Sequence, residues 1–189
     1  MKKFILAAFI CAALPFAAFN YAQAQQNAGG GNVKKVLTVY YSYSGNTAKT
    51  AKQIQKYAGG DIFEIKIKHE YPSKYDNLLD QAKKEIADGF KPVLASKPGN
   101  TGNYDIVFVG SPVWWGTIAP AVSAFLSEYD LSGKTVVPFC THGGGGISRT
   151  FDDIKKLCPD AKFLQGKGFN RSNASENEIS DWIKSLNLN

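Results

Sequence analysis

The stretch Tyr40-Tyr41-Ser42-Tyr43-Ser44-Gly45-Asn46-Thr47-Ala48 follows the apolar run Val36-Leu37-Thr38-Val39 and precedes a segment of helical period. Backbone N–H groups at a helix N-terminus point outward without intrahelical partners, and the helix dipole favours an anion there. The hydroxyl groups of the loop can add hydrogen bonds, and Gly45 lets the backbone come close to a ligand. The loop indicates either a phosphate site or an ordinary capped helix, since Ser, Asn and Thr are common cap residues.

Downstream of this loop, apolar runs of strand length alternate with segments of helical period. The expected strands are 35–40, 61–67, 104–110, 135–139 and 162–165. The expected helices are 47–57, 75–88, 119–128, 147–157 and 176–186, the last with a capping box at Ser175 and Glu178. Five strand–helix units in a row predict one α/β domain over residues 33–189, with a three-layer, doubly wound, five-stranded parallel sheet. The uninterrupted apolar run 106–109 fits a central strand that helices cover on both faces.

The N-terminus has a different character. Two lysines, an apolar stretch from Phe4 to Ala18 and the pattern Ala22-Gln23-Ala24 predict that residues 1–24 are a secretory signal peptide. A permanent membrane anchor is less expected, because the stretch is short for a span of about 20 residues and Pro15 interrupts it. The polar, glycine-rich residues 25–32 are expected to form a flexible linker. We therefore expect an exported protein, periplasmic or secreted, without a permanent membrane anchor.

Charge and cysteine content exclude some classes of function. The chain has 22 basic and 16 acidic residues, a formal charge of +6, and the excess does not form the dense basic stripe expected of a nucleic-acid surface. Cys140 and Cys158 lie at opposite ends of an expected helix, which separates them by roughly 15 Å. A disulfide needs Cα atoms within about 7 Å, so we expect both to be packed, unbridged side chains.

The unusual residues fall in the loops after the first, third and fourth strands, which meet at one edge of a parallel sheet where ligands bind. Trp114 and Trp115 lie side by side between Pro112 and Gly116, which suggests a flat apolar wall, since aromatic faces stack on planar rings. The glycine loop that follows Cys140 can bring N–H groups close to a planar ligand. A structural tryptophan pair and a merely flexible loop are the alternatives.

With these three loops in order, the chain resembles the flavodoxin family, in the branch with Trp-Trp in the second loop. The segments that carry the resemblance are 41–47, 110–116, 141–144 and 71–75, and the match extends from Val33 to the C-terminus. The resemblance implies strand order 2-1-3-4-5 and FMN as the cofactor, with no metal and no catalytic side chain. It implies these cofactor-binding residues: Ser42, Ser44, Gly45, Asn46, Thr47 and Ala48 at the phosphate, Pro112, Val113, Trp114, Trp115 and Gly116 beside the ribityl chain and ring, and Thr141, His142, Gly143 and Gly144 on the ring's other side.

The resemblance leaves three functions open. The first is an exported FMN protein that passes electrons to a redox partner protein or a small-molecule acceptor, with His142 stabilising the reduced anionic flavin. The second is an FMN-dependent quinone or small-molecule reductase, and the third is a cofactor-free binding module. The chain departs from flavodoxins that shuttle electrons, which are commonly acidic and cytoplasmic, because it is slightly basic and is expected to be exported.

Overall fold

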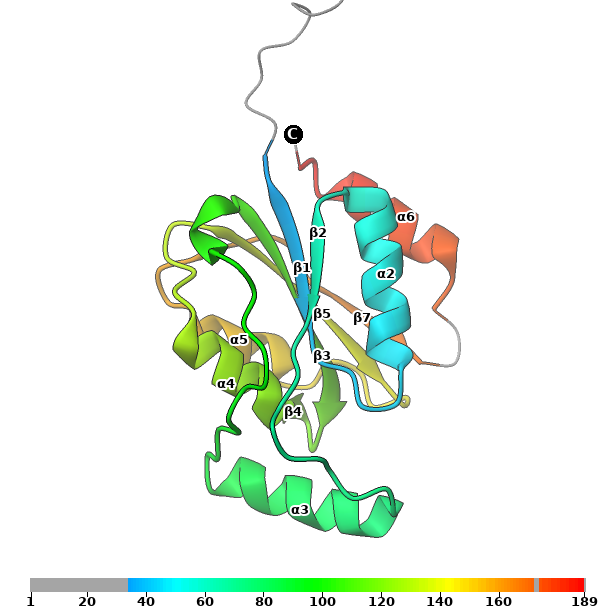
Figure 1. Ribbon diagram of the computed structural model, residues 1–189. Coiled ribbons are helices and arrows are strands. Elements are labelled where there is room, and N and C mark those ends of the chain that lie inside the picture. Colours follow the sequence, from blue (N-terminus) through cyan, green and yellow to red (C-terminus); the bar gives the residue numbers. More distant parts are fainter. Residues whose placement is uncertain (1–33, 172–173, 189) are drawn as a thin grey trace, which may run out of the picture. The chain divides into compact units, whose positions relative to one another are not determined.

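The computed structural model describes residues 34–171 and 174–188 (Figure 1). The predicted signal peptide and linker, residues 1–32, lie outside the described residues. Within the described part the strands are β1 (Val36–Tyr40), β2 (Asp61–Glu64), β3 (Ile106–Trp114), β4 (Thr117–Ile118), β5 (Thr135–His142), β6 (Lys162–Phe163) and β7 (Lys167–Asn170). The α-helices are α2 (Asn46–Ala58), α3 (Tyr75–Ala87), α4 (Pro120–Glu128), α5 (Thr150–Leu157) and α6 (Glu176–Ser185). No helix of this part is long and apolar enough to cross a membrane.

The sheet has the predicted topology. Its order is β2-β1-β3-β5-β6, with every pair along this path parallel, and β4 is a short antiparallel partner at the end of β3. Without β4, which sequence reasoning missed, this is the predicted order 2-1-3-4-5. The predicted doubly wound α/β fold is therefore confirmed.

Helices cover both faces of the sheet, α2 and α6 on one and α4 and α5 on the other (Figure 1). Successive side chains of β3 point to opposite faces. Val107 and Val109 pack with Phe125 of α4, whereas Phe108 packs with Ile54 of α2 and with Trp182 of α6. Both faces of β3 are thus buried, as its apolar run predicts.

The predicted fifth strand, 162–165, is wrong in its extent. Two short strands, β6 and β7, both pair with β5, and the ladder between them is interrupted beside Pro138. The N–H group of Leu164 donates to the carbonyl of Val136. Pro138, two residues further along β5, directs its backbone toward the same neighbouring segment, but a proline has no N–H to donate, so the ladder is interrupted there.

The predicted strand 61–67 ends early, at Glu64, because the chain then pairs with a returning segment instead of β1. The N–H of Lys68 donates to the carbonyl of Val93 at 2.9 Å, and Ile67 bridges Leu94 in antiparallel fashion. Beyond this bridge the chain carries α3, which Figure 1 shows apart from both helical layers, past the carboxyl ends of the strands. This excursion brings a helix to the edge of the sheet where ligands bind.

Two loops also differ from expectation. β3 and β5 run to Trp114 and His142, because their pairing continues as far as Pro112 and Thr141. Residues predicted as loop are therefore held in strands. Conversely, α5 begins at Thr150 rather than at residue 147, since Ser148 has φ 47°, outside the helical region.

Candidate functional site

The loop between β1 and α2 leaves donors free at the start of the helix. Gly45 precedes the helix in a left-handed conformation, φ 84°, and the first turn carries no acidic side chain. Ser42 Oγ accepts from the N–H of Ala48 at 3.2 Å, and Asn46 Nδ2 donates to Ser44 Oγ at 2.9 Å. The amides of the first turn have no intrahelical acceptor, and the dipole there favours negative charge. The arrangement suits an anion.

Thr47 has a structural role within this loop. Its side chain is 1% exposed, and its Oγ1 lies 2.8 Å from Oγ1 of Thr141, which is 5% exposed. This buried hydroxyl pair ties the start of α2 to the end of β5. It fixes the distance between the two loops and leaves the backbone N–H of Thr47 as its free donor.

A cavity of about 530 Å³ opens at the carboxyl ends of the strands. It brings together most of the predicted site residues, namely Ser44, Asn46, Pro112, Val113, Trp114, Trp115, Thr141, His142 and Gly143. The other predicted residues shape the loops without lining the cavity: Ser42, Gly45, Thr47, Ala48, Gly116 and Gly144. The lining also includes residues that sequence reasoning missed: Tyr43, Tyr75, Leu78, Leu79, Ala82 and Arg171.

The two tryptophans differ in their surroundings. The ring of Trp114 meets three tyrosine rings edge to face, with centroids 5.0 Å from Tyr71, 5.9 Å from Tyr41 and 6.1 Å from Tyr43. Trp115 is 49% exposed and has φ 49°, a conformation that is unusual for a bulky residue. Trp114 is therefore a fixed wall of the cavity, and Trp115 stands at its open side.

Helix α3 closes one side of the cavity. Trp115 Nε1 donates to the carbonyl of Leu79 at 3.1 Å, and Lys83 Nζ lies 5.1 Å from the centroid of the indole ring. Leu78 and Ala82 are buried and also line the cavity. The three- and four-residue spacing of Leu78, Leu79 and Ala82 predicts an apolar helix face, but spacing alone does not say whether that face covers a sheet or a ligand cavity.

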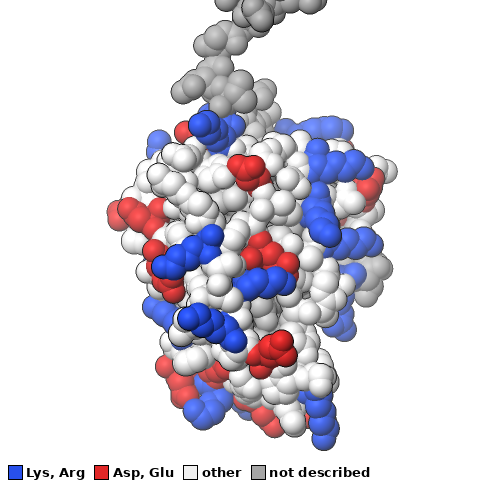
Figure 2. Space-filling model, viewed as in Figure 1, with Lys and Arg blue, Asp and Glu red and all other residues white. Residues whose placement is uncertain are grey.

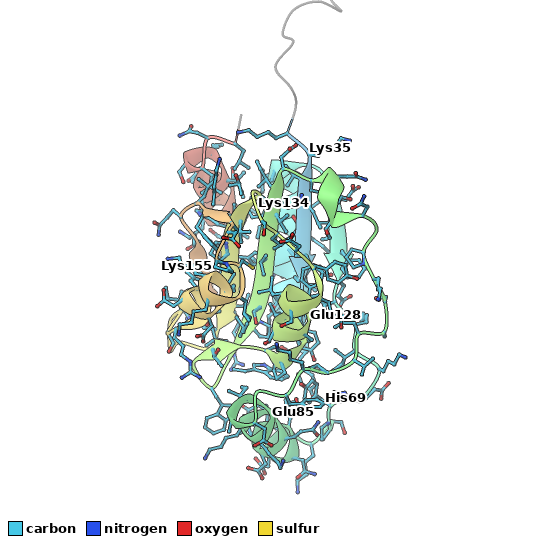
Figure 3. The ribbon with its side chains drawn as sticks, turned by 90° about the vertical axis from the view of Figure 1, so that its left-hand side faces the viewer. Lys35, His69, Glu85, Glu128, Lys134 and Lys155 are labelled. Atoms are coloured by element: carbon cyan, nitrogen blue, oxygen red, sulfur yellow. The ribbon has the colours of Figure 1, made fainter. Side chains whose placement is uncertain are left out.

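The buried carboxylate of Glu85 anchors α3 through hydrogen bonds. Tyr71, 9% exposed, donates its hydroxyl to Glu85 Oε2 at 2.6 Å, and Gln81 Nε2 donates to Oε1 at 2.7 Å. His69 Nε2 lies 3.7 Å from the same Oε1, and Figure 3 shows His69 beside Glu85, which is a residue of α3. Burial, followed by the hydrogen bond to Glu85, raises the pKa of Tyr71 well above its ordinary value. The tyrosine therefore stays a neutral donor, and its ring supports Trp114.

The glycine loop meets the end of β7 at the opposite side of the cavity. His142 Nδ1 accepts from the N–H of Gly144 at 3.2 Å, and the carbonyl of His142 accepts from the N–H of Arg171 at 3.0 Å. A Cβ added to Gly143 would lie 3.3 Å from Cζ of Arg171, so glycine permits this close approach.

Surface charge and cysteine chemistry add no further site. Basic and acidic side chains intermingle over the face in Figure 2. Cys140 and Cys158 are free and buried, which confirms that they are not bridged to each other. Burial raises the pKa of the Cys140 thiol to about 12 and that of Cys158 to about 11, so neither is a reactive thiolate near neutrality. The described residues contain no cluster of three or more His, Cys, Asp or Glu side chains fit for a metal.

The chain is similar to known proteins in both sequence and structure. A family model described as flavodoxin matches residues 35–186. A Bacteroides eggerthii structure assigned to the flavoproteins shares 32% identity over 81% of this chain and 98% of its own, with TM-score 0.72. A Bacteroides uniformis structure assigned in the same way shares 30% identity over 80% of this chain and 98% of its own, with TM-score 0.73.

A more distant likeness concerns the fold alone. A Lactobacillus acidophilus flavoprotein in complex with FMN shares 24% identity over 79% of this chain and 98% of its own, with TM-score 0.64. No protein of curated function matches the chain.

Proposed function

Because this chain belongs to the flavodoxin family, we propose that its cavity binds FMN and that the protein transfers electrons through this cofactor. One observation carries the proposal. The free amides at the start of α2, the ring of Trp114 and the glycine loop come from segments far apart in the sequence, yet they border one cavity. A monophosphate joined to a flat ring requires these three kinds of surface together.

The donor set fits the phosphate of FMN. The amides of Asn46 and Thr47 and the Ser44 hydroxyl can donate to phosphate oxygens, and no acidic side chain lines the cavity among the described residues. This loop matches neither the dinucleotide nor the triphosphate glycine pattern, which favours a mononucleotide.

The ring of FMN would lie between Trp114 and the loop Thr141–Gly143. FMN supplies reversible electron transfer when it is bound, and the protein supplies binding, orientation and electrostatics. Trp114 offers an aromatic surface for stacking, and the tyrosines around it hold its ring in place. His142 is proposed to lie near the polar edge of the ring and to stabilise negative charge there. No nucleophile or metal is required from the chain.

The predicted signal peptide supports export, so the electrons would pass to a redox partner protein or a small-molecule acceptor outside the cytoplasm. One observation favours the small-molecule acceptor. Helix α3 adds the apolar residues Tyr75, Leu78, Leu79 and Ala82 to the cavity wall, which would give a flat organic molecule a surface to bind. Oxidation of a nicotinamide donor by a quinone in the presence of the protein would establish the reductase function.

The test is titration of the purified apoprotein with FMN, followed by visible absorption and by equilibrium dialysis. Bound flavin in a one-to-one ratio supports the proposal. A Ser44→Trp variant, which places a bulky ring in the phosphate loop, should lose binding, whereas Ser127→Trp on the exposed side of α4 should keep it. Failure of the wild-type protein to bind FMN would favour the cofactor-free binding module.

A further inference from the structure

Arg171 brings the only formal charge to the cavity wall among the described residues. All other residues that line the cavity are neutral at pH 7, if His142 is counted as neutral. A guanidinium stays protonated throughout the pH range in which proteins are folded. The cavity therefore has a permanent positive charge on the side of the glycine loop.

The position of this charge follows from β7. Backbone pairing of β5 with β7 ends at His142 and Asn170, and the N–H of Arg171 then donates to the carbonyl of His142. Its guanidinium lies against Gly143, where a Cβ would come within 3.3 Å of Cζ. Arg171 is thus placed beside the loop that would line the polar side of the flavin ring.

The guanidinium of Arg171 has no acidic partner among residues 34–171 and 174–188. Other cations do have one: Lys167 Nζ lies 3.2 Å from Glu178 Oε1, and Arg149 Nε lies 3.0 Å from Asp153 Oδ2. Arg171 is exposed, so solvent screens its charge, but at the cavity wall its guanidinium can still act on an anionic group that the cavity holds.

We propose that Arg171 stabilises negative charge at the polar edge of the bound flavin ring and so favours the reduced cofactor over the oxidised one. This inference rests on the proposed function, since it needs FMN in the cavity. It adds a permanent charge to the stabilisation proposed above for His142. Because an arginine keeps its charge over this pH range, the effect of Arg171 should not depend on pH.

The experiment compares wild type with Arg171→Gln, Arg171→Lys and the control Lys167→Gln, which removes a nearby cation that does not line the cavity. Midpoint potentials are measured by equilibration with reference dyes at several pH values between 6 and 8. Dissociation constants for FMN and riboflavin are measured by fluorescence titration.

Arg171→Gln should weaken binding of the reduced flavin relative to the oxidised flavin by about tenfold, which lowers a two-electron midpoint potential by about 30 mV. The shift should be the same at every pH, and Arg171→Lys should restore part of it. Lys167→Gln should leave the potential unchanged.

An unchanged potential in Arg171→Gln would overturn the inference. So would a loss of FMN affinity with riboflavin affinity and potential unaffected, since the guanidinium would then pair with the phosphate. A shift that disappears toward pH 8 would also overturn it, because it would identify a titrating group. Absence of FMN binding by wild type would instead refute the proposed function, and the two failures are therefore distinguishable.

Discussion

The hydrogen bond between Tyr71 and Glu85 should be a main support of the cavity wall formed by α3. Tyr71→Phe removes the hydroxyl that donates to Glu85 Oε2 at 2.6 Å and leaves a buried carboxylate short of one donor. A hydrogen bond to a charged group contributes about 1.5–3 kcal/mol to stability. For a domain of this size each kcal/mol corresponds to roughly 2–4 °C in Tm, so the variant should melt about 3–12 °C lower.

The matched control is Tyr104→Phe. Tyr104 donates to Asp61 Oδ2 at 2.7 Å, a bond of nearly the same length between exposed groups. Water can replace the lost donor there, so the free energy of unfolding should fall by about 0–1 kcal/mol. Both variants are measured by urea unfolding at pH 7 followed by far-UV circular dichroism.

A double-mutant cycle with Glu85→Gln completes the test. The two side chains are in contact, so their coupling free energy should be about 0.5–3 kcal/mol. Equal costs for Tyr71→Phe and Tyr104→Phe, or a coupling free energy near zero, would refute the reasoning. The aromatic ring at position 71 remains in the variant, so Trp114 should keep its support and FMN affinity should change less than stability.

Three other changes have defined outcomes. Thr47→Val should lower the free energy of unfolding by about 1 kcal/mol through loss of the buried hydrogen bond to Thr141, as measured by urea denaturation. Gly110→Ala should cost more than about 3 kcal/mol, because its Cβ would clash with Cζ of the buried Phe139 ring, and a large fall in the urea midpoint would show this. The buried Cys140 thiol has its pKa raised to about 12, so it stays protonated up to pH 9 and should react with a disulfide reagent no faster than the protein unfolds. Stopped-flow absorbance measures that rate, and rapid reaction of the native protein would contradict the burial argument.

The sheet could be predicted from the sequence because its signals are local. The apolar run 106–109 and the strand–helix alternation depend on neighbouring residues, and they predicted the parallel sheet with its central strand, whereas the strand order was predicted from the family resemblance. The early end of the predicted strand 61–67 could not be foreseen. It depends on pairing between Ile67 and Leu94, residues far apart in the sequence, and no local pattern predicts that contact.

The site was predictable to a similar extent. Glycines, hydroxyls and aromatic residues at strand ends are unusual in composition, and so Ser44, Trp114 and Gly143 could be identified as cavity residues. Leu79 and Arg171 could not, since an apolar residue on a helix and a cation after a strand are ordinary features. They line the cavity only because α3 and β7 are placed beside it by tertiary pairing.

If the cavity binds FMN as proposed, the excursion between Ile67 and Leu94 would determine which molecules could reach the flavin. The loops at the end of the sheet supply the phosphate loop, Trp114 and the glycine loop, which would hold the proposed mononucleotide. Helix α3 is held by hydrogen bonds at two separate points. The carbonyl of Leu79 accepts from Trp115 Nε1, and Glu85 Oε2 accepts from the hydroxyl of Tyr71. Since α3 belongs to neither helical layer, changes at Tyr75 and Leu79 can alter the cavity wall without disturbing the sheet core, whereas Leu78 also packs into that core. Acceptor selectivity would therefore be set on α3, and retention of the cofactor by the sheet loops.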